Sequence, residues 1–445
     1  IEMGAGVTQF IRNHAQKLKN PPVFTATILG DKCCFIADPK YLPIVFKAKY
    51  TKYLDSLSLQ KQFSSRVLDT NEKETEENFR VDVNKVSTQQ YHRFLFKGDE
   101  LQKSMEKVQN FFAELAPQLA PKGGDWVQHD LYDLVVGSVF KATMGPVFSE
   151  HIVTDAMYHN FRDFDKGTIN LFNEAPGFLT RKAREARSRI LQTVSKPEFW
   201  NESSNFFKER REALLNELNV SESTFHKANM GLLWASVGNT APAVFWTLLL
   251  LLEHEDAWKT CKAQVEQVVA KRESEDGMFT LDELDELTYL ESAFMESLRM
   301  YHGAFTARRV VEDFVLETPE QNYLIEKGAK MMSWWGVLHH NPDIFEDADK
   351  FKFDRFVGTS KGNFTFKDGK PLPHEPIMPF GGGQQYCPGR KFASYETRLY
   401  LVMLMESFEM RLGEGEGRPN VDPAMIGIGV SHPDRDLKVE IRSRK

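Results

Sequence analysis

The ten residues Phe380-Gly-Gly-Gly-Gln-Gln-Tyr-Cys387-Pro-Gly389 carry the strongest fold signal in this chain. They place a single cysteine at the end of a glycine-rich hairpin, just before an apolar segment that predicts a helix from Phe392 to Phe408. Backbone N–H groups and a helix N-terminus both stabilise a thiolate relative to a thiol. The stretch therefore predicts a cysteine that can bind a metal ion. A glycine-rich turn with an incidental cysteine is the alternative.

The composition is that of a globular protein with room for a large ligand. At 445 residues the chain exceeds the usual size of one compact core, so two subdomains or one large, ligand-filled domain are expected. The net charge is −7 and the pI is about 6.0, so no nucleic-acid partner is expected. The few cysteines do not suggest a disulfide framework and are typical of a reducing compartment. They are Cys33, Cys34, Cys261 and Cys387.

The protein is expected to contact a membrane through its surface rather than through a membrane-spanning helix in this sequence. The longest apolar run, Ala241 to Leu252, is shorter than the roughly 20 residues that cross a bilayer, so it predicts a buried helix. Because the chain begins at Ile1 without an initiator methionine, we expect a preceding signal or N-terminal anchor to be absent from this sequence. Three apolar residues and the basic residues after them could place a loop and a basic helix against anionic lipid: Phe172, Phe178 and Leu179, followed by Arg181, Lys182, Arg184 and Arg187. Packing at a substrate entrance and a solvated helix face remain alternatives.

The pattern along the chain predicts a mainly α protein with a smaller β subdomain. The opening hundred residues mix short extended runs with turns, including a hairpin around Gly30-Asp31. Helical patterns dominate from Glu100 to about Met300, and a closing β-hairpin is predicted from Val421 to Ile441. We expect a single catalytic domain over residues 1–445. Its β-rich parts would be about 20–60, 304–380 and 421–441, and its helical parts about 85–303 and 388–410.

Glu296-Ser-Leu-Arg299 lies on one predicted helix, where i, i+3 spacing brings the carboxylate and the guanidinium to one face. Such a pair is common on solvated surfaces. Arg355, in Phe353-Asp-Arg-Phe356, could supply a second guanidinium to the same glutamate. Arginine binds carboxylates through a rigid bidentate fork, so the three residues could form a structural Glu–Arg–Arg knot beneath a buried site.

The order of Glu-x-x-Arg, Phe-x-x-Phe and Phe-x-x-Gly-x-x-x-Cys-x-Gly resembles the cytochrome P-450 haem-thiolate monooxygenases over almost the whole chain. The resemblance implies the cytochrome P-450 fold and haem b, with Cys387 as the proximal iron ligand that favours O–O cleavage. Phe380 would pack near the haem. Gly383 and Gly389 would let the backbone approach the sulfur closely.

One position in the loop departs from the family. Gln385 stands where an arginine or histidine is usual, so the loop supplies no cation to a haem propionate there. Arg308 is the expected propionate ligand, because it lies on the strand that follows the Glu-x-x-Arg helix in this family. Arg309 is the alternative, since adjacent strand residues face opposite sides. Arg93 and Lys97 are weaker candidates, for which a solvated position is as plausible.

The long helix predicted from Thr224 to Glu253 contains Gly238-Asn239-Thr240-Ala-Pro242. Proline removes a helical hydrogen bond and glycine weakens the same turn, so the helix should be distorted there. The resemblance assigns an acid and a threonine to this place, as a proton relay to reduced oxygen. Here Asn239 replaces the acid and has no proton to deliver at neutral pH, so a relay would run through Thr240 and ordered water.

The segment from Trp234 to Trp246 resembles the branch that contains cholesterol and oxysterol 7α-hydroxylases, sterol 12α-hydroxylase and prostacyclin synthase. This implies hydroxylation of an apolar substrate, a sterol or oxysterol, with O₂. NADPH would act only indirectly, through a flavoprotein reductase. An isomerase of a prostaglandin endoperoxide or fatty-acid hydroperoxide is the alternative, and Thr240 favours oxygen activation. The resemblance also implies a monomer at the endoplasmic reticulum membrane, with its catalytic domain facing the cytosol.

Overall fold

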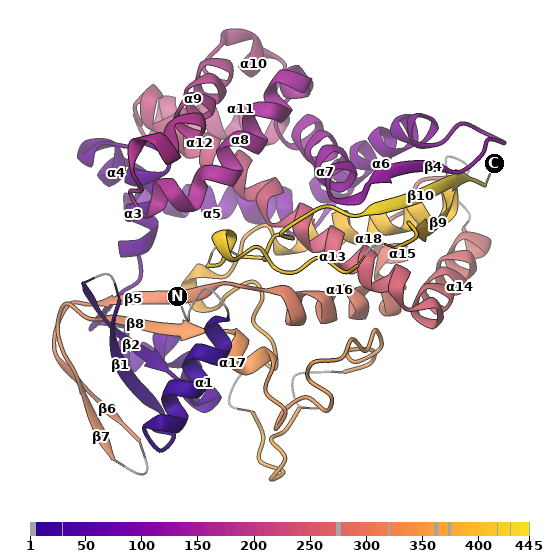
Figure 1. Cartoon of the computed structure of the whole chain (residues 1–445). Helices are drawn as coiled ribbons and strands as arrows, with labels where there is room; N and C mark the ends of the chain where they lie inside the picture. Colours follow the sequence, from indigo (N-terminus) through magenta and orange to yellow (C-terminus); the bar gives the residue numbers. More distant parts are fainter. Residues whose placement is uncertain are drawn as a thin grey trace.

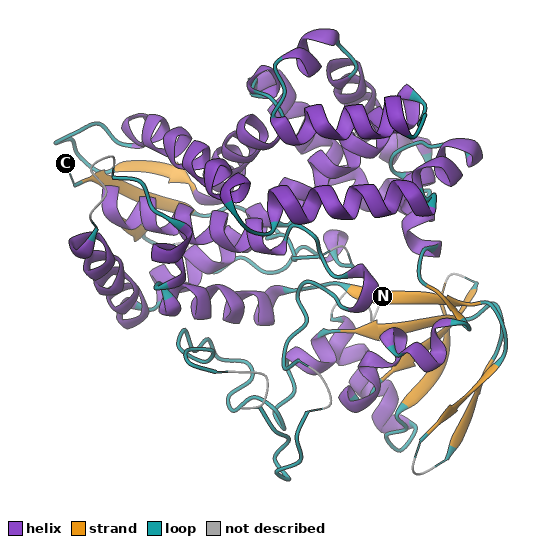
Figure 2. Cartoon of the chain, turned by 180° about the vertical axis from the view of Figure 1, so that it is seen from behind, coloured by secondary structure: helices purple, strands orange, loops and turns teal. Residues whose placement is uncertain are grey.

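The computed structural model describes residues 6–28, 30–272, 277–318, 321–359, 364–372, 375–415, 417–427 and 429–444. Most of these residues belong to a helical body, and the strands gather in two separate places beside it (Figures 1 and 2). The expectation of a mainly α protein with a smaller β portion is confirmed.

The larger sheet joins segments from distant parts of the chain. Its order is β1-β2-β8-β5-β3, with a β1–β2 hairpin that turns at Gly30 (φ +87°). Strand β2 pairs in parallel with β8, and β8 pairs antiparallel with β5. Strands β6 and β7 form a separate two-stranded sheet. The bounds are β1 Val23–Ile28, β2 Asp31–Ile36, β3 Leu54–Asp55, β5 Phe305–Val310, β6 Phe314–Glu317, β7 Asn322–Ile325 and β8 Lys330–Trp334.

The helical body is built around α13, whose residues from Thr240 to Leu251 are all buried. It packs against α7, α16 and α18, and with α12 it forms an apolar stretch long enough to cross a bilayer. Of the 18 residues in its most apolar part, 78% are buried inside the protein. The stretch is therefore a core helix, as the sequence predicts. The bounds are α1 Val7–Lys17, α2 Ala48–Thr51, α3 Ser58–Arg66, α4 Glu72–Asn78, α5 Val81–Leu95, α6 Asp99–Leu119, α7 Leu131–Val147, α8 Asp155–Phe172, α9 Gly177–Val194, α10 Pro197–Asn201, α11 Asn205–Arg211, α12 Glu222–Gly238, α13 Thr240–Glu253, α14 Glu255–Lys271, α15 Leu281–Asp285, α16 Thr288–Tyr301, α17 Gly336–His339 and α18 Arg390–Ser407.

Local sequence explains several helix ends. Asn71 and Glu74 form a reciprocal capping box at the start of α4, and Thr280 and Glu283 form another at the start of α15. The last part of the predicted helical region is divided into two helices, since α15 ends at Asp285 and α16 starts at Thr288.

Three sequence-based boundaries are wrong. The opening hundred residues contain α1, α3, α4 and α5 in addition to the short strands. Within the part expected to be β-rich over 304–380, the described strands end at Trp334, and short turns and loops dominate from there to residue 382. The closing hairpin over 421–441 is reduced to isolated bridges. Strand β10 (Lys438–Ser443) instead pairs with β4 (Val127–Asp130) and β9 (Phe408–Leu412).

Candidate active site

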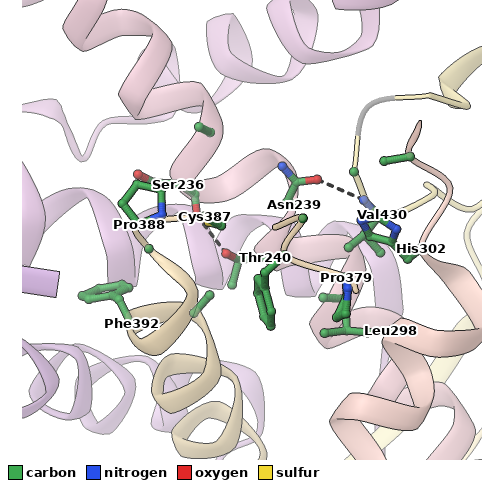
Figure 3. A pocket seen from close by; sticks show the side chains of 18 of the residues that line it. Ser236, Asn239, Thr240, Leu298, His302, Pro379, Cys387, Pro388, Phe392 and Val430 are labelled. Carbon is green, nitrogen blue, oxygen red and sulfur yellow. Dashed lines mark hydrogen bonds between the residues drawn. The ribbon is translucent and has the colours of Figure 1, made fainter. Parts of the chain in front are cut away.

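A cavity of about 350 Å³ lies between the junction of α12 with α13 and the loop that carries Cys387. Figure 3 shows polar residues on two of its sides: Ser236, Asn239 and Thr240 at the helix junction, and Cys387 in the loop before α18. Most of the remaining wall is apolar. It includes Leu95, Val147, Leu298, Phe305, Phe380, Phe392 and Val430. Such a wall suits a largely apolar ligand, because a few polar groups then fix its orientation.

Cys387 opens onto this cavity from the end of its loop. Its backbone N–H donates to the carbonyl of Phe380 at 2.9 Å, which closes the hairpin. Burial raises the pKa of the Cys387 thiol, while the N–H groups of Gly389 and Arg390 and the Arg390 charge act in the opposite direction. The expected stabilisation of the thiolate is therefore present, but burial outweighs it. A metal ion bound to the sulfur would supply the missing positive charge and displace the proton.

The two loop glycines differ in what they require. Gly383 has φ +62°, and a Cβ there would lie 3.1 Å from the Phe46 ring, so a larger residue would be strained and crowded. Gly389 has an ordinary φ of −85°, and no protein atom lies within 4 Å of its ideal Cβ position. Since Gly389 lines the cavity, its missing side chain leaves room for the ligand. Phe380 lines the same cavity.

Gln385 binds protein rather than contributing a cation. Its amide Nε2 donates to the carbonyl of Ser56, which ties the cysteine loop to the segment after β3. Arg308 on β5 lies close by, with its guanidinium 5.5 Å from the ring centre of Phe46, the ring that also crowds Gly383.

Arg308 is buried at 5% exposure, and its one described hydrogen bond goes to the carbonyl of Ala307. Burial lowers the pKa of this guanidinium to about 10, and the Asp55 carboxylate, which forms no ion pair with it among the described residues, opposes this shift through its charge. A buried charge that lacks a directly bonded counter-ion is costly, so the site fits an anionic group from a ligand.

The other cations considered from the sequence lie elsewhere. Arg309 is exposed on the opposite side of β5. Arg93 is 60% exposed and pairs with Glu209 at 2.7 Å, and Lys97 is exposed. These positions leave Arg308 as the arginine of this set that is buried beside the cysteine loop.

The helix junction has a defined hydrogen-bond pattern. Helix α12 ends at Gly238 and α13 starts at Thr240, so Asn239 lies at the break that the sequence predicts. The Thr240 hydroxyl donates to the carbonyl of Ser236 at 2.9 Å. The Asn239 Oδ1 atom accepts from the N–H of Val430 at 3.0 Å. Asn239 thus holds the C-terminal loop against the helix, in addition to lining the cavity.

Glu296, Arg299 and Arg355 meet beneath the cysteine loop. Arg299 binds both carboxylate oxygens of Glu296 at 2.7 and 2.8 Å, and Arg355 adds a contact at 2.9 Å. The remaining Arg299 donors bind the carbonyls of His339 and Ala348, each at 2.7 Å. Glu296 and Arg299 have no exposed surface. The arrangement is structural, since it fixes the loop after α17 against α16.

Several cavity residues have no signal in the sequence. His302 follows α16 and forms a bridge with Val430, and burial lowers its pKa to about 4. Ser236 supplies the acceptor for Thr240. Both residues enter the site through tertiary contacts, so no local motif marks them.

The residues of the cavity fit haem. Cys387 offers one soft ligand, and the described residues contain no cluster of three His, Cys, Asp or Glu that would form a protein-only metal site. The apolar wall suits a flat macrocycle, and the unpaired Arg308 suits a carboxylate at its edge.

Comparison with known proteins agrees with this geometry. A family model described as Cytochrome P450 matches residues 2–439. The 25-hydroxycholesterol 7-alpha-hydroxylase of Rattus norvegicus is 28% identical over 371 residues, which cover 79% of this chain and 87% of that protein. The 7-alpha-hydroxycholest-4-en-3-one 12-alpha-hydroxylase of Homo sapiens is 35% identical over 237 residues, 51% of this chain and 47% of that protein. The solved structure of retinoic acid bound cyanobacterial CYP120A1 has a TM-score of 0.72 at 18% identity, covering 97% and 93% of the two chains, and supports the fold.

Proposed function

The chain belongs to the cytochrome P450 family, and we propose that it is a monooxygenase that hydroxylates a sterol or an oxysterol. The observation that carries the proposal is one apolar cavity with Cys387 on one wall and the Asn239–Thr240 break on another. The relatives named as sterol and oxysterol hydroxylases or monooxygenases align over most of the chain and support the substrate class.

We propose that the cofactor is haem b, which supplies an iron that activates dioxygen when it receives electrons. Cys387 would hold the iron as a thiolate, and the N–H groups of Gly389 and Arg390 would steady the charge on its sulfur. Arg308 would bind a propionate, which would give its buried guanidinium an anion at ion-pair distance in addition to the charge of Asp55. Phe380 would pack against the macrocycle.

Thr240 and Asn239 would have different roles on the substrate side of the cavity. The Thr240 hydroxyl can release the Ser236 carbonyl and donate to water in the cavity, so it would handle protons beside the oxygen site. Asn239 cannot deliver a proton of its own at neutral pH. Because its Oδ1 is already used by the Val430 N–H, its remaining amide donors would position water or substrate.

The electrons would come from an NADPH-dependent flavoprotein reductase, and the protein would act as a monomer at the endoplasmic reticulum membrane, facing the cytosol. Phe178 and Leu179, 80% and 51% exposed at the start of α9, support a membrane surface as a contact. They are followed by basic residues that anionic lipid attracts: Arg181, Lys182 and Arg184.

Turnover of a sterol panel tests this function. Purified haem-loaded protein with reductase and NADPH is expected to convert at least one sterol or oxysterol to a product that carries one atom from labelled O₂. Loss of product on removal of NADPH or O₂ is the expected control. Rearrangement of an endoperoxide mimic without NADPH or O₂, together with no sterol oxidation, would contradict the proposal and favour an isomerase.

A further inference from the structure

One carboxyl group lies fully buried behind the cavity wall and has no role in the site described above. Glu396 of α18 has no exposed surface. Its Oε1 accepts a hydrogen bond from the hydroxyl of Thr143 on α7. Its Oε2 has no hydrogen-bond partner among the described residues. Because burial of an incompletely bonded carboxyl group costs free energy, this one requires an explanation.

Glu396 and Thr143 form the layer directly behind residues that line the cavity. Thr397 follows Glu396 in the chain and Phe392 lies one helical turn before it, and both line the cavity. Val147, one turn after Thr143 on α7, lines it as well. Residues four apart on a helix are neighbours, so the carboxyl group lies next to this wall. Six helical steps separate Glu396 from the start of α18 beside the cysteine loop, a distance of about 9 Å.

No charged side chain of the described residues compensates Glu396. Burial raises its pKa to about 8, and the Thr143 hydrogen bond is the one opposing influence. The charged and titratable groups on the helices packed around it are engaged or lie apart. On α7, Lys141 lies 3.9 Å from Asp155, and Ser138 forms a hydrogen bond with Tyr400 of α18. Arg398 and Tyr395 of α18 bind Asp285 of α15, and Glu291 of α16 lies 3.9 Å from Arg398. On α14, Cys261 is buried, and burial raises its pKa.

Resting on the proposed function, we propose that Glu396 is the proton-accepting group coupled to reduction of the haem iron. When haem is bound, one electron from the reductase would reduce its iron and so add one negative charge on the cavity side of the carboxylate. A nearby negative charge raises the proton affinity of a carboxylate. At a pH near or above 8, where the carboxyl group is ionised before reduction, Glu396 therefore takes one proton from a solvent donor, whose O–H bond breaks, as the electron arrives. The new O–H bond is the only bond made in the protein, and the added charge is neutralised behind the cavity wall.

The size of the coupling follows from Coulomb's law. With an effective dielectric constant of about 20, one charge added about 12 Å away would shift the Glu396 pKa by about one unit. That is a tenfold change in proton affinity between the two redox states. For a one-electron couple it lowers the midpoint potential by about 59 mV as the pH rises through both pKa values.

A redox titration of the substrate-free holoenzyme tests the proposal. The midpoint potential is measured with dithionite and mediator dyes from about pH 6 to about pH 10. The wild type is expected to show a fall of about 59 mV centred above about pH 8 that is missing from Glu396→Gln. The matched control Glu406→Gln removes a carboxyl group near the opposite end of the same helix and should keep the fall.

Thr143→Val keeps the carboxyl group and removes the hydrogen bond that lowers its pKa, so the fall should move to higher pH. The same pH dependence in wild type and Glu396→Gln would overturn the proposal. If Glu396→Gln retains no haem, the Thr143→Val variant decides instead. A midpoint potential that falls over the same pH range in Thr143→Val and in the wild type would overturn the proposal. These potentials need no substrate, so a haem-loaded protein that oxidises no sterol would refute the proposed substrate class while leaving this coupling standing.

Discussion

Gln385 shows what a single residue can and cannot predict. Its identity in the cysteine loop indicates that the loop lacks a cation, and this directs attention to Arg308 in a strand almost eighty residues earlier. The sequence does not indicate that Gln385 would instead bind the Ser56 carbonyl, or that Phe46 would lie between Arg308 and the loop. Those contacts depend on how distant segments pack, and no local pattern encodes them.

Arg308 and Arg309 offer a matched pair for testing the cofactor contact. Arg308→Leu is expected to weaken haem binding roughly 10- to 100-fold, because a charge-assisted hydrogen bond to a buried partner contributes about 1.5–3 kcal/mol. Arg309→Leu changes an exposed residue on the same strand and should bind haem as the wild type does. The rate of haem transfer to excess apomyoglobin measures both. Equal transfer rates for the two variants would exclude Arg308 as a propionate ligand.

For the broken helix, the sequence predicts the position of the break but not the segment that packs against it. Gly238 and Pro242 indicate a distortion, because each weakens the helical hydrogen-bond pattern, and α12 does end at Gly238. The partner of the break could not be predicted. The C-terminal loop was expected to be a strand of a hairpin, whereas its Val430 N–H is held by Asn239. A one-residue break in a helix leaves hydrogen-bonding groups without helical partners, and the tertiary fold determines which groups they bind.

Gly429 tests the link between the break and the loop. Gly429 has a φ of +83°, and a Cβ at this position would lie 1.7 Å from the Asn239 Oδ1 atom. Gly429→Ala should break the Asn239–Val430 hydrogen bond and weaken sterol binding roughly 3- to 10-fold, since such a bond contributes about 0.5–1.5 kcal/mol. Gly98→Ala is the control, because Gly98 has φ +84° and an open Cβ position. Spectral titration with a sterol measures the affinity. Equal affinities in the two variants would show that the contact does not shape the cavity.

At the scale of the whole molecule, two distant parts of the chain build the sheet that carries Arg308. Strand β2 from the N-terminal region pairs in parallel with β8, and β8 pairs with β5. The sequence motifs indicate the family and the general division into helical and β-rich parts. They do not indicate the helices of the first hundred residues, whose stability depends on packing against distant segments: α1, for example, buries Val7 and Ile11 in the cluster that contains Ala307 of β5.

The central claim is that this fold brings Cys387 to a haem iron as its thiolate ligand. The most direct measurement is the absorption spectrum of the purified, reduced protein with carbon monoxide bound. The account predicts the red-shifted band from which the cytochrome P450 family takes its name, and its loss in Cys387→Ala. A wild-type protein that binds haem but shows only the shorter-wavelength band of neutral-ligand haem proteins would contradict the claim.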